Sequence, residues 1–228
     1  MTNGHYNFNS GIQTMNQSPY QTISYNNKQS VTNFTVQSGN YQSGSQSNQI
    51  SQQSSPPHNQ GAQPEFVIET FKLGSRYEGY KLNGMRHGQG KFFYQDGGMY
   101  DGEWVKNKME GYGKLYYQSG KFRLILGKIA YEGMWVQDQF TGKGVLYNEN
   151  PDPLNEPFNY ENFDNVEESW TKYEGEFLED SKNGKGVLYL SNGEYFEGNF
   201  LNDTAQGEGV YTTMSGKKIR GIWEMNLL

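Results

Sequence analysis

Tyr100-Asp101-Gly102-Glu103-Trp104, followed by Gly111-Tyr112-Gly113, decides the fold, because the same arrangement returns along most of the 228-residue chain. Position 0 is the first aromatic or large apolar residue of each unit. Units begin at Tyr77, Tyr100, Tyr131, Tyr173 and Phe196, and a truncated unit begins at Ile219. A recurring spacing with two insertions predicts a tandem repeat whose units stack on their neighbours.

Each unit opens with aromatic residues and glycine in alternation, which predicts a strand with one aromatic face. Positions 0, +2 and +4 read Tyr77/Gly79/Lys81, Tyr100/Gly102/Trp104, Tyr131/Gly133/Trp135, Tyr173/Gly175/Phe177, Phe196/Gly198/Phe200 and Ile219/Gly221/Trp223. Position +7 carries residues that tolerate a left-handed backbone: Gly84, Asn107, Asp138, Asp180 and Asp203. A turn is therefore expected at +7.

A second strand is expected after this turn, because a glycine pair and then a large residue recur at +11, +13 and +15. The glycine pairs are Gly88/Gly90, Gly111/Gly113, Gly142/Gly144, Gly184/Gly186 and Gly207/Gly209. If opposed positions sum to 15, the +4 ring lies across the +11 glycine of its own unit, which has no side chain to obstruct it. In the unit of Tyr100, this register places Gly111 opposite Trp104.

The other face of this hairpin is expected to be polar, because position +1 is acidic in every complete unit. The same register sets Glu78 opposite Lys91 and Asp101 opposite Lys114. We expect cross-strand ion pairs there, each worth about 0–1 kcal/mol on an exposed face.

The pattern Tyr-x-Gly-x-Trp, then Gly-x-Gly, then Gly, at a period of 23 residues, resembles the MORN repeat (membrane occupation and recognition nexus) from Gly74 to Trp223. The resemblance implies an all-β, elongated array of stacked antiparallel hairpins. The first unit departs from it, with Lys81 in the aromatic position. Small proteins made only of such repeats resemble components of cilia, axonemal spoke heads and other cytoskeletal assemblies.

Residues 1–64 differ in kind from the rest, being rich in Asn, Gln and Ser, with Lys28 as their only charged side chain apart from histidine. Such a segment buries too little apolar surface to fold, so we expect a disordered tail. Its spaced aromatic residues leave two interpretations, self-association or a solvated tail.

The chain has no secretory leader, no apolar run near 20 residues and no cysteine. We therefore expect it to be cytoplasmic and to lack a transmembrane segment.

Residues 65–228 hold the array, and alternation over Phe66–Phe71 predicts a leading strand. A first insertion, at about 121–128, is apolar and carries Lys121, Arg123 and Lys128; it is read as longer strands or as a basic contact. A second insertion, at about 149–169, is acidic and contains aromatic residues that we expect to be exposed. It is either a docking element for a basic partner or a loop whose rings fold back onto the array. Its candidate partner-binding residues are Asp152, Glu156, Phe158, Tyr160, Phe163, Asp164, Glu167, Glu168 and Trp170.

No enzyme signature is present, since glycine pairs such as Gly88-Gln89-Gly90 lack the third glycine of a dinucleotide site and the Ser or Thr of a P-loop. No cofactor or metal site is expected. Nucleic-acid binding is not expected either, because no basic stripe exists.

We therefore expect a protein-interaction scaffold in a cytoskeletal or ciliary assembly. The truncated last repeat either caps the sheet or leaves an edge that pairs with a second copy or a partner strand. The alternative is a peripheral module that binds acidic phospholipid through Lys217, Lys218 and Arg220.

Overall fold

The structure is a computed structural model that describes residues 61–118 and 127–228. The expected disordered tail, residues 1–64, lies outside this range except for its last four residues, and Lys121 and Arg123 of the first insertion also lie outside it. Contacts separate Met1–Gly61 from Ala62–Leu228, and the second unit holds all the repeats.

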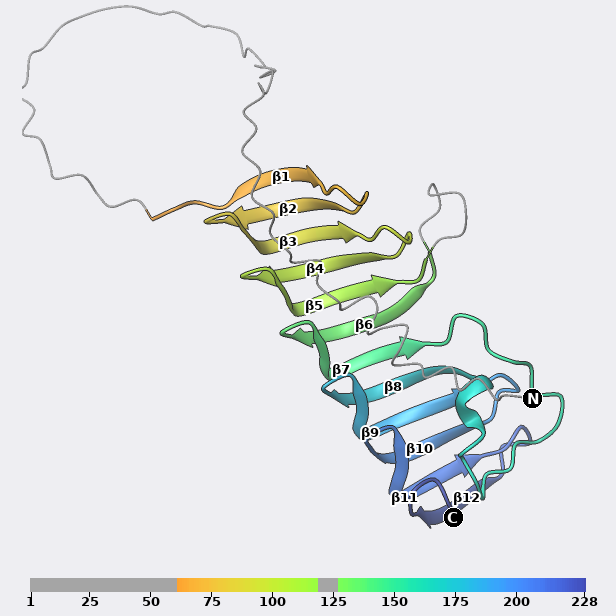
Figure 1. The fold of residues 1–228 in the computed structure, drawn as a ribbon. Helices are drawn as coiled ribbons and strands as arrows, with labels where there is room; N and C mark the ends of the chain where they lie inside the picture. Colours follow the sequence, from red (N-terminus) through yellow and green to blue (C-terminus); the bar gives the residue numbers. More distant parts are fainter. Residues whose placement is uncertain (1–60, 119–126) are drawn as a thin grey trace, which may run out of the picture. The chain divides into compact units, whose positions relative to one another are not determined.

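Residues Ala62–Leu228 form one antiparallel sheet of twelve strands that follow each other in chain order (Figure 1). The strands are β1 (Glu65–Thr70), β2 (Arg76–Leu82), β3 (Met85–Phe93), β4 (Met99–Val105), β5 (Lys108–Tyr116), β6 (Ile129–Val136), β7 (Gln139–Tyr147), β8 (Trp170–Leu178), β9 (Ser181–Leu190), β10 (Tyr195–Leu201), β11 (Thr204–Thr212) and β12 (Lys218–Trp223). In the described residues, helical structure is limited to one 3₁₀ turn, Val166–Glu168. The expected all-β array of stacked hairpins is confirmed, and the expected leading strand is β1, paired with β2.

Within each hairpin, the register agrees with the expectation in the part far from the turn and differs from it in the part near the turn. In the hairpin of β4 and β5, Tyr100 faces Leu115 and Gly102 faces Gly113, as expected, but nearer the turn Trp104 faces Met109 and not Gly111. Two extra residues on β5 form a bulge, and Gly111 there has a φ of 66°. The expected pairing of +4 with +11 in one unit is therefore wrong.

The first unit carries the same change, directly after Gly79. Gly79 faces Gly90, as expected. The register then shifts between Gly79 and Lys81, so that Lys81 faces Arg86 and not Gly88. The expected register is therefore wrong beyond Gly79, and Gly79 is the last residue of β2 that keeps it.

The turn explains this shift. In the unit of Tyr100, its two central residues lie at +6 and +7, with φ of 48° at Lys106 and 73° at Asn107. Two successive residues of positive φ are the two-residue turn that matches the twist of a hairpin. The turn lies one position earlier than expected, so two residues of the second strand have no partner on the first strand and form the bulge. The bulge requires a left-handed backbone at +11, which glycine adopts readily. The +11 glycine faces the +4 residue of the next unit instead, as Gly111 faces Trp135.

Position +7 also joins each hairpin to the one before it. The Asn107 side-chain oxygen accepts a hydrogen bond from the Arg86 backbone N–H at 2.8 Å, and the Asn107 backbone N–H donates to the Arg86 carbonyl at 3.0 Å. The same pair of bonds recurs between Asp138 and Met109, Asp180 and Phe140, Asp203 and Lys182, and Asn226 and Ala205. We call this contact the turn clamp. Its acceptor explains why Asn or Asp stands at +7 in every unit that has a repeat before it.

The tyrosine at position 0 is what requires the two glycines that face each other at +2 and +13. The Tyr100 ring lies flat over Gly102 and Gly113: a Cβ atom at Gly113 would be 2.3 Å from the Tyr100 hydroxyl oxygen. That hydroxyl donates to the Glu103 carbonyl at 3.1 Å. Burial raises the pKa of the Tyr100 hydroxyl, as it does at the equivalent tyrosines.

Gly79 separates the two explanations of the glycines, because its unit has Lys81 in place of the +4 ring. If the +4 ring required the glycines, Gly79 would have room for a side chain. A Cβ atom at Gly79 would instead lie 2.5 Å from the Gly90 Cα atom and 2.6 Å from the Tyr77 hydroxyl oxygen. At Gly79 the position-0 ring and the facing backbone therefore exclude a side chain without any +4 ring. The same contact with that ring recurs at +2 in the other complete units: Gly102, Gly133, Gly175 and Gly198.

The +4 rings fill the spaces between successive position-0 rings. The ring centroid of Trp104 is 5.7 Å from that of Tyr77 and 5.1 Å from that of Tyr100, in edge-to-face contacts. The same alternation continues along the array through Tyr100, Trp135, Tyr131, Phe177, Tyr173, Phe200, Phe196 and Trp223. Each of these rings is at most 5% exposed. The core is therefore a column of rings shared between units, and no unit can complete it alone.

The first unit ends this column. Because no tyrosine precedes it, position +4 has no space between rings to fill, and Lys81 pairs there with Glu69 of β1 at 2.6 Å. The departure of the first unit from the pattern thus has a structural reason.

Candidate functional site

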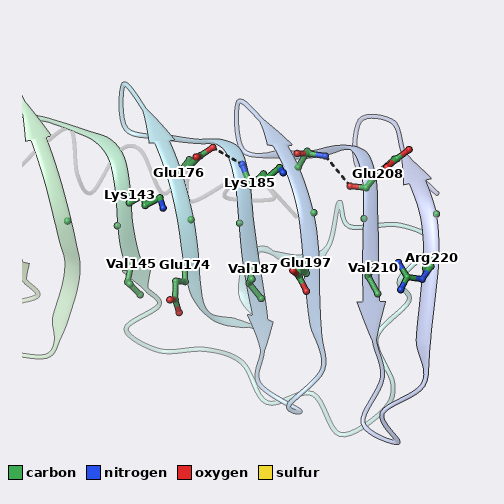
Figure 2. A pocket seen from close by; sticks show the side chains of 18 of the residues that line it. Lys143, Val145, Glu174, Glu176, Lys185, Val187, Glu197, Glu208, Val210 and Arg220 are labelled. Carbon is green, nitrogen blue, oxygen red and sulfur yellow. Dashed lines mark hydrogen bonds between the residues drawn. The ribbon is translucent and has the colours of Figure 1, made fainter.

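The face of the sheet opposite the aromatic column is recessed over its C-terminal half. We call this recess the trough; it lies mainly over β7–β12 and has a volume of about 1370 Å³. Figure 2 shows two rows of side chains rising on either side of a line of glycines. Row A comprises Lys143, Glu176, Lys185, Asn199, Glu208 and Ile222, and row B comprises Val145, Glu174, Val187, Glu197, Val210 and Arg220.

The repeat places these side chains. Positions +1 and +3 on the first strand of a hairpin, and +12 and +14 on the second, all face away from the aromatic column. Neighbours within a row are on adjacent strands and so about 5 Å apart, while rows A and B are two residues apart along a strand, about 7 Å. The glycines between the rows leave bare backbone as the floor of the trough.

Row B changes character along the sheet. In the N-terminal half, position +14 is lysine, and the lysines form ion pairs: Lys91 with Asp101 at 2.8 Å and Lys114 with Glu132 at 3.0 Å. The hydrogen bond to Asp101 raises the pKa of the Lys91 ammonium.

The ion pairs of these lysines differ from those that we expected. Glu78 does lie opposite Lys91, and Asp101 lies opposite Lys114. Each lysine nevertheless pairs with the acid on its other side, in the next hairpin. On a sheet, the strands on both sides are equally near, so the side chain selects between two neighbours that a hairpin register alone does not distinguish.

In the trough, valine replaces lysine at +14, and the acids of row B lose these partners. Glu197 forms no ion pair in the described part of the chain, and Glu174 pairs only with Lys172 of its own strand, at 3.2 Å. Over the ranges 61–118 and 127–228, exposed charged side chains of the trough with no ion pair are Lys143, Lys185, Glu197, Glu208, Lys218 and Arg220. The change from Lys to Val at +14 is visible in the sequence, but its meaning depends on which strands are neighbours.

Side chains at +3 hold the bulges that border row A. The Glu176 carboxylate accepts from the Lys185 backbone N–H at 3.0 Å, and the Asn199 amide donates to the Glu208 carbonyl at 3.2 Å (Figure 2). The Glu176 charge is therefore turned toward the backbone, while the Lys143 and Lys185 side chains remain exposed on either side of it.

The acidic insertion lies behind the trough, against the aromatic column. Phe163 is 2% exposed, and its ring centroid is 5.0 Å from that of Phe196 and 6.1 Å from that of Trp223. Trp170, the first residue of β8, is also buried. The insertion thus closes the core of the last units.

A buried carboxylate fastens the insertion. Glu194 is 1% exposed, and it accepts hydrogen bonds from the Phe158 backbone N–H at 2.8 Å and the Tyr211 hydroxyl at 2.7 Å. It also accepts from the Asn192 amide and the Met214 backbone N–H. Burial alone would raise the Glu194 pKa, but these donors together outweigh it and the pKa is lowered.

Eight of the nine candidate partner-binding residues of the insertion divide into two sets, and the side chain of the ninth, Glu167, lies outside what the structure describes. The rings of Phe163 and Trp170 are buried against the array, and Phe158 and Tyr160 are half-buried. The rings fold back, as the alternative reading had it. Asp152, Glu156, Asp164 and Glu168 are exposed, and partner binding by these acids stays a prediction.

The three candidate lipid-binding residues lie at the last strand. Lys218 and Arg220 belong to β12 and line the trough, while Lys217 lies in the preceding turn. Among the strands of the described residues, β12 pairs with β11 alone, and the chain end folds back next to β12 through a Glu224–Leu227 bridge. The Trp223 indole N–H donates to the Tyr160 carbonyl at 3.0 Å, so the insertion also covers this end.

Within the described residues, no group of three His, Cys, Asp or Glu side chains is placed to hold a metal ion. No helix there has the length and apolar character needed to cross a membrane.

A sheet of hairpins whose core forms only between neighbours is a repeat array. The MORN repeat matches the chain at residues 77–99, 100–122, 131–150, 173–195 and 196–218, and the chain is a MORN repeat protein. These matches begin at the five position-0 residues of the complete units. MORN repeats are generally modules for protein or lipid interaction and are a non-catalytic repeat type. A comparison with curated proteins found no match.

Proposed function

We propose that this protein is a non-enzymatic interaction scaffold whose trough docks a segment of a partner protein. The observation that carries the proposal is the set of exposed charges without ion pairs in the trough, which lie among half-buried valines. In the N-terminal half of the same face, the row B charges form ion pairs with one another. Charges that find no partner within the chain favour a complementary partner and suppress wrong ones. Valines among them supply apolar area for contact.

The rigidity of the array supports this role. Turn clamps join successive hairpins, and the shared ring column fixes their spacing. A surface built on such a frame is already in its binding conformation, so little conformational entropy is lost when a partner binds. We place the protein in the cytoplasm, in a cytoskeletal or ciliary assembly; the support for this placement is the resemblance to small proteins made only of MORN repeats.

The proposal is tested by blocking the trough. Full-length protein is used to recover partners from the native cell, next to a variant with Val145→Arg and Val187→Arg. These half-buried positions lie on the trough face. The control carries the same two arginines outside the trough, as Gln89→Arg and Met214→Arg, at exposed positions. Loss of a partner from the trough variant alone supports the proposal, and equal recovery by all three proteins contradicts it.

Binding of acidic phospholipid is the second candidate, favoured by the exposure of Lys217, Lys218 and Arg220 at one end of the sheet. Against it, Glu197 and Glu208 line the same recess as Lys218 and Arg220. A membrane-surface site calls for clustered bases without such acids. Co-sedimentation with phosphatidylserine vesicles that is lost in salt, and lost on charge reversal of the three bases, would favour lipid over protein.

A further inference from the structure

The charges of the trough are sorted by side on strands β7–β10. Row A presents Lys143 and Lys185, and row B presents Glu174 and Glu197 (Figure 2). All four side chains are exposed. Apart from the contact of Glu174 with Lys172, none of the four forms an ion pair in the described ranges. Row A also contains Glu176 between the two lysines, with its carboxylate turned toward the Lys185 backbone N–H. The exposed side-chain charges of these strands are therefore positive on one side of the trough and negative on the other.

The charges on each side repeat every second strand. Lys143 is on β7 and Lys185 on β9, while Glu174 is on β8 and Glu197 on β10. Two strand spacings amount to about 10 Å. Val145 and Val187 occupy the row B positions on β7 and β9, so the acids alternate with small apolar groups.

Resting on the proposed function, we propose that the trough takes an α-helical segment of a partner protein, lying across the strands. The segment carries acidic residues along one edge, toward Lys143 and Lys185, and basic residues along the other, toward Glu174 and Glu197. Each charge recurs every seven residues. Apolar side chains on the face between these edges contact Val145 and Val187.

The repeat of the charges selects a helix. A rise of 1.5 Å per residue makes seven residues about 10.5 Å, and seven residues are close to two full turns, so the charge returns to the same edge. An extended segment covers about 10 Å in three residues, but its side chains alternate with a period of two. The third residue then faces the opposite way. A helix about 10 Å wide also reaches both rows when it lies over the glycine floor.

The last hairpin reverses the charges. Glu208 on β11 continues row A, and Arg220 on β12 continues row B. A helix long enough to reach them must exchange its acid and base edges at that point. This reversal fixes the position and the direction of the helix in the trough.

The test uses fluorescence anisotropy with full-length protein and two fourteen-residue peptides held helical by a staple. The first has glutamates on one edge and lysines on the other, at seven-residue spacing. The second has the same composition with both charges mixed on each edge. We expect the sorted peptide to bind at least about tenfold more tightly than the mixed one, because the mixed peptide opposes like charges on both sides.

Charge-reversal variants complete the test. Reversing one side, as Lys143→Glu with Lys185→Glu or as Glu174→Lys with Glu197→Lys, is expected to weaken binding of the sorted peptide about tenfold or more. Reversing all four residues restores binding, because the peptide turned end for end presents its edges the other way round. The fourfold variant has the net charge of the native protein, so its recovery excludes a bulk electrostatic effect.

The inference is overturned if both peptides bind equally, if neither binds, or if the one-sided reversals leave binding unchanged. Tighter binding after the glutamates alone are reversed would indicate a trough that attracts any anion. These outcomes do not affect the proposed function, which depends on loss of a cellular partner from the variant with Val145→Arg and Val187→Arg.

Discussion

Substitution of Gly113 by alanine tests the packing rule on which the whole array depends. In each repeat, the position-0 ring lies flat on a pair of glycines that face each other across the hairpin. At Gly113 an added Cβ atom would lie 2.3 Å from the Tyr100 hydroxyl oxygen and 2.6 Å from two ring carbons, where ordinary contacts are 3.4–4 Å. The ring must therefore retreat by about 1 Å.

Displacement of the Tyr100 ring is destabilising because the ring is closely packed on both sides. Tyr100 is 0% exposed, with Trp104 and Trp135 each 5.1 Å from it, centroid to centroid. Forcing extra volume into such a core costs about 1–3 kcal/mol. Displacement of the hydroxyl from the Glu103 carbonyl adds about 0.5–1.5 kcal/mol. We expect Gly113→Ala to lower the free energy of unfolding by about 1.5–4.5 kcal/mol in total.

Urea denaturation of the full-length protein, followed by tryptophan fluorescence, measures this change. The matched control is the same substitution made in a Tyr100→Leu background, where the shorter side chain leaves room for the new methyl group. There Gly113→Ala is expected to be neutral or to stabilise by up to about 1 kcal/mol, because glycine weakens a strand. A loss below about 0.5 kcal/mol in the native background, or an equal loss in both backgrounds, would refute the reasoning.

Three further predictions use the same denaturation assay. Asp180→Ala removes the acceptor for the Phe140 N–H in a turn clamp and should cost about 1–3 kcal/mol, while Asp180→Asn keeps the acceptor and should cost less; equal losses would exclude the clamp. Because the Glu194 pKa is lowered on folding from an ordinary value of 4.5, its stabilising effect is fully present above that value and is lost as the pH falls through the lowered pKa. The stability advantage of the native protein over Glu194→Gln should therefore shrink on acidification from neutral pH, and a constant difference would be inconsistent with a charged Glu194. Lys91→Ala removes an ion pair on an open face and should cost no more than about 1 kcal/mol; a larger loss would mean that this face is buried.

The sequence was sufficient for those features that repeat. The all-β class, the position-0 rings and the paired glycines follow from period-two alternation within a recurring unit. The leading strand follows from the same alternation over Phe66–Phe71, ahead of the first unit. The bulge did not follow, because Gly111 appeared to serve the ring of Trp104. A glycine that relieves steric crowding, such as Gly79, and a glycine that adopts a positive φ, such as Gly111, look the same in a sequence.

Contacts between units were the other limit. Asn or Asp at +7 was interpreted as a turn former, which is correct, but its bond to the preceding hairpin depends on a neighbour 21 residues or more away. The trough was missed for the same reason. Valine at +14 in the later units acquires its meaning only when Glu197 is seen to have lost the lysine that pairs with its counterparts.

The insertion shows how composition can mislead. Its aromatic residues and acids suggested one docking surface, but the two kinds of side chain separate in the fold. Rings such as Phe163 complete a core that the truncated last repeat cannot close alone, and the acids remain on the outside.

The central claim is that partners bind in the trough, and cross-linking with mass spectrometry tests it most directly. A partner recovered from the native cell on full-length protein is treated with an amine-reactive cross-linker. We predict cross-links from the partner to Lys143 and Lys185. Lys182, which pairs with Asp203 and lies near the ring of Tyr173 behind the trough, is the internal control and should remain free of them. Cross-links that favour Lys182, with none at Lys143 or Lys185, would contradict the claim and place the partner elsewhere on the array.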